Sequence, residues 1–166
     1  MEKNLLIFIF ILDCQIAIAQ NRITITDPEI KFSIEAPLDW IKYDDGYYYY
    51  LIIPSEAADE NLSITYLETK STLPDSIFEF TINQIYPLNE PGYNLLETGD
   101  ESINNLSAKW AIFTSIDRNV HYKRFIFMFI EHGQIFKIQG TSRLENFDAH
   151  VERFRSIIKS IRIEKL

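Results

Sequence analysis

Residues 121–142, HYKRFIFMFIEHGQIFKIQGTS, decide the fold because they read as two long strands joined at His132-Gly133. Side chains alternate between the two faces of a strand. The apolar side chains of the first strand divide accordingly into Phe125, Phe127 and Phe129 on one face and Ile126, Met128 and Ile130 on the other. A strand with one solvent-exposed face would instead alternate apolar with polar residues. We therefore expect a central strand that is covered on both faces.

The residues around this hairpin predict an antiparallel meander. Short turns at Asn104-Asn105, at residues 117–119 and at His132-Gly133 separate four long strands, and such turns require antiparallel neighbours. The expected strands span residues 31–36, 40–43, 47–53, 62–68, 94–103, 106–116, 120–131 and 134–140. Residues 20–29 are expected to be a polar leader that precedes the first strand.

Two segments have helical periodicity. The first is expected to begin with Thr72 as its cap and to end at Pro87. Its core-facing side chains are expected to be Ile77, Phe78, Phe80, Ile82 and Ile85. The second, at about residues 146–160, has apolar residues at steps of four and three: Phe147, Val151, Phe154, Ile158 and Ile161. We expect these helices to cover the two faces of the hairpin, which gives a layered α+β fold.

The first nineteen residues have the pattern of a signal peptide. Residues 5–12 form an unbroken apolar run, and Ala17-Ile18-Ala19 supplies the small residues of a cleavage site before Gln20. A retained membrane anchor is an alternative, but the run is far shorter than the ~20 residues that span a bilayer. Lipid attachment at Cys14 is a second alternative, but Asp13 precedes this cysteine where a lipobox normally has a small, uncharged residue. We expect export to a periplasmic or extracellular location, with no membrane span after cleavage.

The remaining chain, residues 20–166, is expected to form a single domain. A chain of this size buries enough surface to fold without covalent crosslinks. The only cysteine, Cys14, lies in the expected signal peptide. The exported chain therefore has no thiol for catalysis or for binding a metal.

Charge is distributed unevenly along the chain. Residues 20–100 contain fifteen acidic and four basic side chains, whereas residues 101–166 contain seven acidic and eleven basic side chains. An acidic protein of this kind is not expected to bind nucleic acid. The asymmetry is either ordinary scatter over a folded surface or a bipolar surface that orients the protein against a partner.

Short sequence motifs occur near both ends of residues 20–166. Residues 32–40, FSIEAPLDW, combine a strand with a Pro-x-x-Trp sequence, and residues 133–138, GQIFKI, combine a glycine turn with the last long strand. Phe147, Phe154 and residues 157–161, IIKSI, form a closing helix. Together these features resemble the PsbP-like family, which includes DcrB-like envelope proteins and the Ran-binding Mog proteins, over nearly all of residues 20–166.

The resemblance implies an α-β-α sandwich around a central antiparallel sheet, with a four-stranded meander and a C-terminal helix. It also implies a family without shared catalytic residues, whose members mostly bind or assist other proteins. No binding motif of the family matches this sequence, so the resemblance assigns no functional residue.

The sequence contains no pattern that indicates catalysis or a cofactor. Nucleophile-elbow, P-loop, dinucleotide-binding and HExxH patterns are all absent. His121 and His132 lie at opposite ends of one strand, roughly 35 Å apart at ~3.3 Å per residue, and cannot share a metal ion. His150 is expected on the polar surface of the last helix. We therefore assign no catalytic residue, metal site or cofactor.

Residues 47–50, four consecutive tyrosines, follow the Asp44-Asp45-Gly46 turn. The tyrosines either pack beneath a covering helix or line a groove where amphipathic rings recognise a peptide or glycan. The paired carboxylates also suggest a divalent ion, although calcium needs several converging oxygens. The candidate ligand-binding or partner-binding residues are Asp44, Asp45, Tyr47 and Tyr49.

Three functions remain open from the sequence. The first is an exported, non-enzymatic module that binds or supports an envelope or secreted protein. The second is a protein that binds a peptide, glycan or divalent ion through residues 44–50. The third is a hydrolase of unrecognised type, which requires a cleft with converging titratable groups. The sequence does not indicate an oligomeric state.

Overall fold

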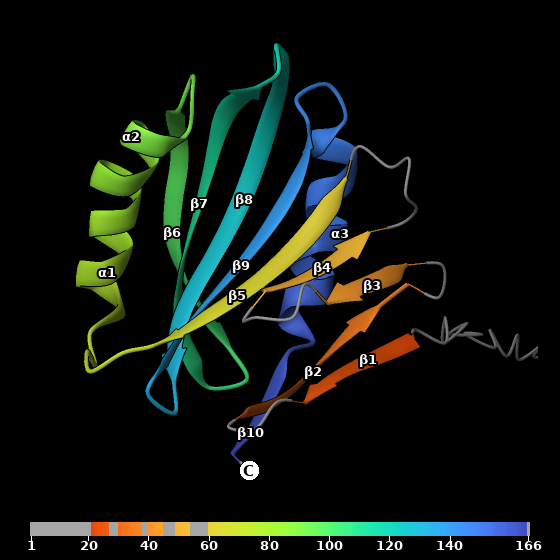
Figure 1. Cartoon of the computed structure of the whole chain (residues 1–166), viewed down its shortest axis with the longest axis vertical. Coiled ribbons are helices and arrows are strands. Elements are labelled where there is room, and N and C mark those ends of the chain that lie inside the picture. The colour runs from red at the N-terminus through yellow and green to blue at the C-terminus, as the bar shows by residue number, and fades with distance from the viewer. Residues whose placement is uncertain (1–20, 27–29, 38–39, 45–48, 54–59, 166) are drawn as a thin grey trace, which may run out of the picture.

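Helices lie on both sides of a large antiparallel sheet (Figure 1). The computed structural model describes residues 21–26, 30–37, 40–44, 49–53 and 60–165. Among these, the larger sheet has the strand order β3-β4-β5-β9-β8-β7-β6, with every neighbouring pair antiparallel. Its strands are β3 (Ile41–Asp44), β4 (Tyr49–Ile53), β5 (Asn61–Glu68), β6 (Asn94–Ile103), β7 (Leu106–Asp117), β8 (Val120–Glu131) and β9 (Gln134–Arg143).

The hairpin of β8 and β9 lies in the middle of this sheet, as the sequence predicts. His132 and Gly133 have positive φ angles of 49° and 75°, as a tight turn between twisted strands requires. The buried side chains of β8 divide between two cores, with Phe125, Phe127 and Phe129 in the first and Ile126 and Met128 in the second. The prediction that both faces of this strand are covered is confirmed.

The first face is covered by helix α3 (Phe147–Lys159) and by a small antiparallel sheet. That sheet consists of β1 (Asn21–Thr26), β2 (Ile30–Ala36) and β10 (Arg162–Lys165), with β2 in the middle. The predicted apolar stripe of α3 is confirmed, because its buried side chains include Phe147, Phe154 and Ile158. Gly140 on β9 permits this packing, since a Cβ atom there would lie only 2.5 Å from Cγ of Phe154.

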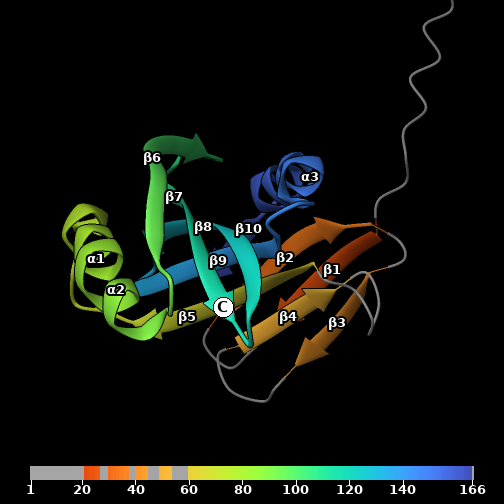
Figure 2. The same ribbon diagram turned by 90° about the horizontal axis from the view of Figure 1, so that it is seen from above.

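The second face is covered by a helical segment of three consecutive parts. They are α1 (Pro74–Phe80), the π-helical turn η1 (Thr81–Ile85) and α2 (Tyr86–Asn89). Its buried side chains are Phe78, Ile82 and Tyr86, which pack with Ala111, Phe113, Ile126 and Met128 of β7 and β8. Viewed from above, the helical segment and α3 lie on opposite sides of β7 and β8 (Figure 2). The α+β fold with helices on both faces of the sheet is therefore confirmed.

Three predicted boundaries are wrong. Leu73 rather than Thr72 precedes the first helical turn, and no side chain caps it. The segment continues through Pro87 to Asn89, because Tyr86 N–H bonds to the Thr81 carbonyl in the wide π turn and Pro87 then occupies an early position of α2, where no amide donor is needed. The expected leader contains strand β1, which pairs with β2 along its whole length.

Candidate functional site

Two of the residues singled out from the sequence, Asp44 and Tyr49, lie on β3 and β4, the two outer strands at one side of the larger sheet. Asp44 pairs with Tyr50 in the β3–β4 hairpin, and Tyr49 pairs with Thr65 of β5. The predicted hairpin is thus confirmed. Asp45 and Tyr47 lie outside the described residues. A binding role for these four residues stays a prediction.

His121 and His132 lie at the two ends of β8, as the sequence predicts, and Nε2 of His132 is 3.4 Å from a carboxylate oxygen of Glu131. Over the ranges that the structure describes, no three His, Cys, Asp or Glu side chains come together as metal ligands. No helix in those ranges is long and apolar enough to cross a membrane.

His150 is not a free surface residue, contrary to the sequence interpretation. Its Nδ1 atom lies 2.9 Å from Ser142 Oγ and 2.9 Å from Glu60 Oε2, and Arg153 donates to the other Glu60 oxygen at 2.8 Å. Glu60 is only 7% exposed. The sequence pattern missed these contacts because Glu60 is distant in the chain and precedes β5.

This Ser142–His150–Glu60 cluster does not have the geometry of a catalytic triad. In a triad the serine and the carboxylate contact different nitrogens of the imidazole ring. Here both contact Nδ1, and Ser142 is fully buried. The cluster therefore ties β5, β9 and α3 together and offers no accessible nucleophile.

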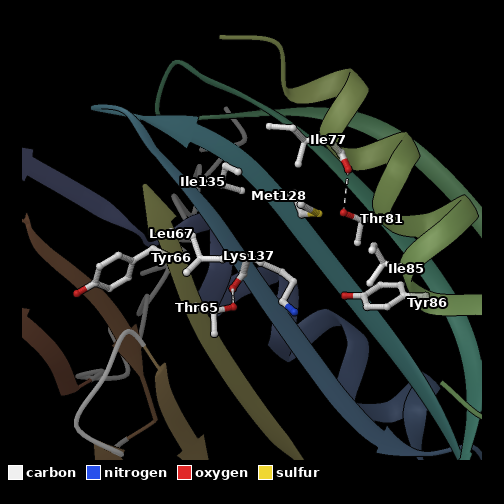
Figure 3. A pocket seen from close by; sticks show the side chains of 10 residues that line it. All are labelled: Thr65, Tyr66, Leu67, Ile77, Thr81, Ile85, Tyr86, Met128, Ile135 and Lys137. Carbon is white, nitrogen blue, oxygen red and sulfur yellow. Dashed lines mark hydrogen bonds between the residues drawn. The ribbon is translucent and has the colours of Figure 1, made fainter. Parts of the chain in front are cut away.

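A groove of about 410 Å³ lies between the helical segment and the neighbouring face of the sheet (Figure 3). The helical segment packs on β7 and β8, so side chains of the same sheet face on β9 and β5 form the groove floor. The residues that line the groove are Thr65, Tyr66, Leu67, Ile77, Thr81, Ile85, Tyr86, Met128, Ile135 and Lys137. Its volume and its mainly apolar lining are typical of small-molecule sites.

The helical segment presents more apolar surface than the sheet covers. Phe78, Ile82 and Tyr86 are buried, whereas Ile77 and Ile85 line the groove beside them. Thr81 lies between these two isoleucines, and its hydroxyl donates to the Ile77 carbonyl at 2.8 Å, so its polar group is satisfied within the helix. The helix wall of the groove is therefore effectively apolar.

Lys137 is the one basic side chain among the groove-lining residues. Its ammonium lies 5.8 Å from the centre of the Tyr86 ring, a cation–π contact. Burial lowers the pKa of Lys137, the Glu90 carboxylate raises it by a smaller amount, and Arg124 lowers it. Among the described residues, no carboxylate forms an ion pair with this ammonium. The groove therefore contains a partly desolvated cation without a neutralising partner.

Polar side chains that do not line the groove lie close to Tyr86. The Tyr86 hydroxyl donates to Oε1 of Gln139 at 3.4 Å, and burial raises the pKa of Tyr86, so the phenol stays neutral. Arg124 lies 3.4 Å from Glu90, which leaves its guanidinium paired with the nearest carboxylate. The Arg124 Nε atom is buried and has no hydrogen-bond partner among the described residues.

The groove was not predicted from the sequence, although the sequence contains one signal for it. Residues 134–139 alternate, because Phe136 and Ile138 are fully buried whereas Lys137 and Gln139 are partly exposed. Such alternation indicates that one face of β9 is less covered than the same face of β8. The position of the helical segment over β7 and β8 is set by tertiary packing and is not encoded in that local pattern.

No protein-family model and no curated protein match the sequence. Solved structures do match, at low identity. Cyanobacterial PsbP (CyanoP) from Synechocystis sp. PCC 6803 is 15% identical with a TM-score of 0.65, and the match covers 90% of this chain and 96% of CyanoP.

Two further structures share the arrangement. LpqN, involved in cell envelope biogenesis of Mycobacterium tuberculosis, is 14% identical with a TM-score of 0.61, covering 87% of this chain and 91% of LpqN. The Saccharomyces cerevisiae Ran-binding protein Mog1p is 9% identical with a TM-score of 0.60, covering 87% of this chain and 96% of Mog1p. The chain therefore has the PsbP-like fold that the CyanoP, LpqN and Mog1p structures share.

Proposed function

We propose that the protein is an exported, non-enzymatic module that binds a protein partner through the outer side of its helical segment. The observation that carries this proposal is a row of exposed apolar side chains. Leu73, Phe80 and Leu88 are 65%, 58% and 82% exposed. Large apolar side chains that gather on one element of a surface are typical of protein interaction sites.

The π turn favours a common side of the helical segment for Phe80 and Leu88. Leu73 precedes the first turn in an extended conformation and lies at the N-terminal end of the segment. Leu88 follows Phe80 by eight residues, but the π turn accommodates one additional residue. Leu88 is thereby brought to the side of Phe80, next to the groove-facing Ile77 and Ile85.

Several observations support a binding role over catalysis. The Ser142–His150–Glu60 cluster lacks triad geometry and an exposed hydroxyl. Mog1p, which has the same fold, is a Ran-binding protein, and LpqN is involved in cell envelope biogenesis. The apolar run at residues 5–12 and the small residues at Ala17-Ile18-Ala19 support export. The partner is accordingly expected among envelope or secreted proteins.

The test uses a double variant, Phe80→Ala with Leu88→Ala, and a matched control, Leu144→Ala. Leu144 is also exposed, at 45%, but it follows β9 and lies outside the helical segment. Each purified protein is immobilised and incubated with an envelope extract at several salt concentrations, and captured proteins are quantified by mass spectrometry.

We expect specific proteins to be captured by the wild type and by L144A, and to be reduced at least ~10-fold with F80A/L88A, since losing a buried apolar anchor typically costs ~2 kcal/mol of binding. The proposal fails if the wild type captures no reproducible partner at any salt concentration. It also fails if the double variant captures the same proteins in the same amounts.

A further inference from the structure

The groove beside the helical segment combines an apolar trough with one cation, which is a different surface from the exposed Phe80 and Leu88 row. Leu67 and Ile135 form its floor and Ile77 and Ile85 its helix wall, with the Lys137 ammonium directed toward Tyr86 (Figure 3). These apolar side chains offer contact to a chain of methylene groups. The trough alone would accept any apolar ligand, so the cation decides the ligand class.

The charged side chains around the groove favour the binding of one anionic group beside Lys137. Glu90 and Arg124 pair with each other at 3.4 Å, so the Glu90 carboxylate is already engaged. Within the described part of the chain, the Lys137 ammonium forms no ion pair and lies over the Tyr86 ring. Desolvating an unpaired ammonium is unfavourable, and an anion placed beside it removes that penalty.

We propose that this groove binds an amphipathic monocarboxylate, with an alkyl chain along Leu67, Ile77, Ile85 and Ile135 and its carboxylate against the Lys137 ammonium. The volume of about 410 Å³ lies within the range of small-ligand sites. A neutral alcohol of equal length would fill the trough but leave the ammonium unpaired. An alkyl ammonium would place two like charges together. The groove therefore discriminates by charge as well as by length.

The first experiment is isothermal titration calorimetry of the purified protein with three probes of equal chain length, each used below its micelle concentration or, for the alcohol, below its solubility limit. The probes are dodecanoate, dodecan-1-ol and dodecyltrimethylammonium. We expect saturable one-to-one binding of dodecanoate, at least ~10-fold tighter than that of the alcohol, and no saturable binding of the ammonium compound. Octanoate, decanoate and dodecanoate should each gain about fourfold in affinity per added methylene, because burying one methylene contributes ~0.8 kcal/mol.

The variants separate the groove from general adsorption. Lys137→Met should weaken dodecanoate binding at least ~10-fold while leaving dodecan-1-ol unchanged. Lys159→Met is the matched control, because Lys159 lies on α3 and pairs with Glu101 on the other side of the sheet. Ile85→Trp, which fills the groove from its mouth, should block all binding. Circular dichroism confirms that each variant is folded.

A second readout does not depend on calorimetry. Dodecanoate should protect Lys137, and not Lys159, from acetylation by acetic anhydride, measured by mass spectrometry. Equal affinity of dodecanoate for wild type and K137M overturns the assignment, as does the absence of saturable dodecanoate binding. Either result leaves partner binding through Phe80 and Leu88 standing, because those two side chains do not line the groove.

Discussion

The pKa values of Lys137 and Lys109 are shifted in opposite directions from that of an ordinary lysine. A hydrogen bond from the Lys109 ammonium to Asp100, at 2.6 Å, raises the pKa of Lys109, and Asp75 at 3.4 Å acts in the same direction. Burial instead lowers the pKa of Lys137, which has no such carboxylate beside it. The difference follows from what surrounds each ammonium on the same face of the sheet.

This contrast predicts how the two amines react with acetic anhydride as the pH is raised. Only the neutral amine reacts, and a lowered pKa means that the neutral form appears at lower pH. Each acetylation rate is divided by the rate of the same peptide in urea, and the ratio is plotted against pH. The pH at the midpoint of this profile should be lower for Lys137 than for Lys109. Mass spectrometry of tryptic peptides measures both rates in one sample. A Lys137 midpoint equal to or above that of Lys109 would contradict the described environment.

At the scale of elements, Glu60 and Arg153 join the start of β5 to α3. Glu60 is buried, whereas the Arg153 side chain is 46% exposed, so solvent screens part of their attraction. Nδ1 of His150 lies 2.9 Å from the other Glu60 oxygen. These contacts fix α3, which packs on β8 and β9, to the start of the neighbouring strand β5.

A double-mutant cycle measures this link. Glu60→Gln and Arg153→Met, alone and combined, should show a coupling free energy of about 0.5–1 kcal/mol in urea unfolding. The control cycle is Lys31→Met with Glu164→Gln, an exposed pair of β2 and β10 at 2.8 Å, for which we expect a smaller coupling. Coupling in the control that equals or exceeds that of Glu60 and Arg153 would show that burial adds nothing to this link.

Long strands and helices could be predicted from the sequence because their patterns are local. The two-faced apolar run of β8, its glycine turn and the stripe of α3 all match the structure. Pro87 misled the helix prediction, since the π turn that accommodates it depends on packing of Phe78, Ile82 and Tyr86 against the sheet. Strands β1 and β10 are short, and only their pairing with β2 defines them.

The candidate site was less predictable than the fold. The groove requires β5, β8, β9 and the helical segment to come together, and no local pattern encodes that arrangement. Phe80 shows the same limit. It was expected in the core from its helical spacing, yet it is exposed, because the side of the segment that bears Phe78 packs on the sheet.

At the scale of the whole molecule, the two oppositely charged parts of the chain are brought together. Acidic residues from before β6 and within it pair with basic residues from the later strands and α3. The pairs are Glu60 with Arg153, Asp75 and Asp100 with Lys109, and Glu90 with Arg124. Some of the acidic residues in the first part of the sequence therefore form ion pairs with basic residues of the second part. The helical segment also carries exposed apolar side chains, among them Leu73, Phe80 and Leu88.

We expect both faces of β8 to maintain the fold and the exposed apolar row of the helical segment to contribute little to stability, which leaves that row free to bind a partner. Urea unfolding of Ile126→Ala, Phe127→Ala and the double variant Phe80→Ala with Leu88→Ala tests this claim. We expect each core variant to lose about 2–5 kcal/mol of unfolding free energy, and the double variant to lose less than about 1 kcal/mol. A core variant with near wild-type stability, or a double variant as unstable as the core variants, would contradict the claim.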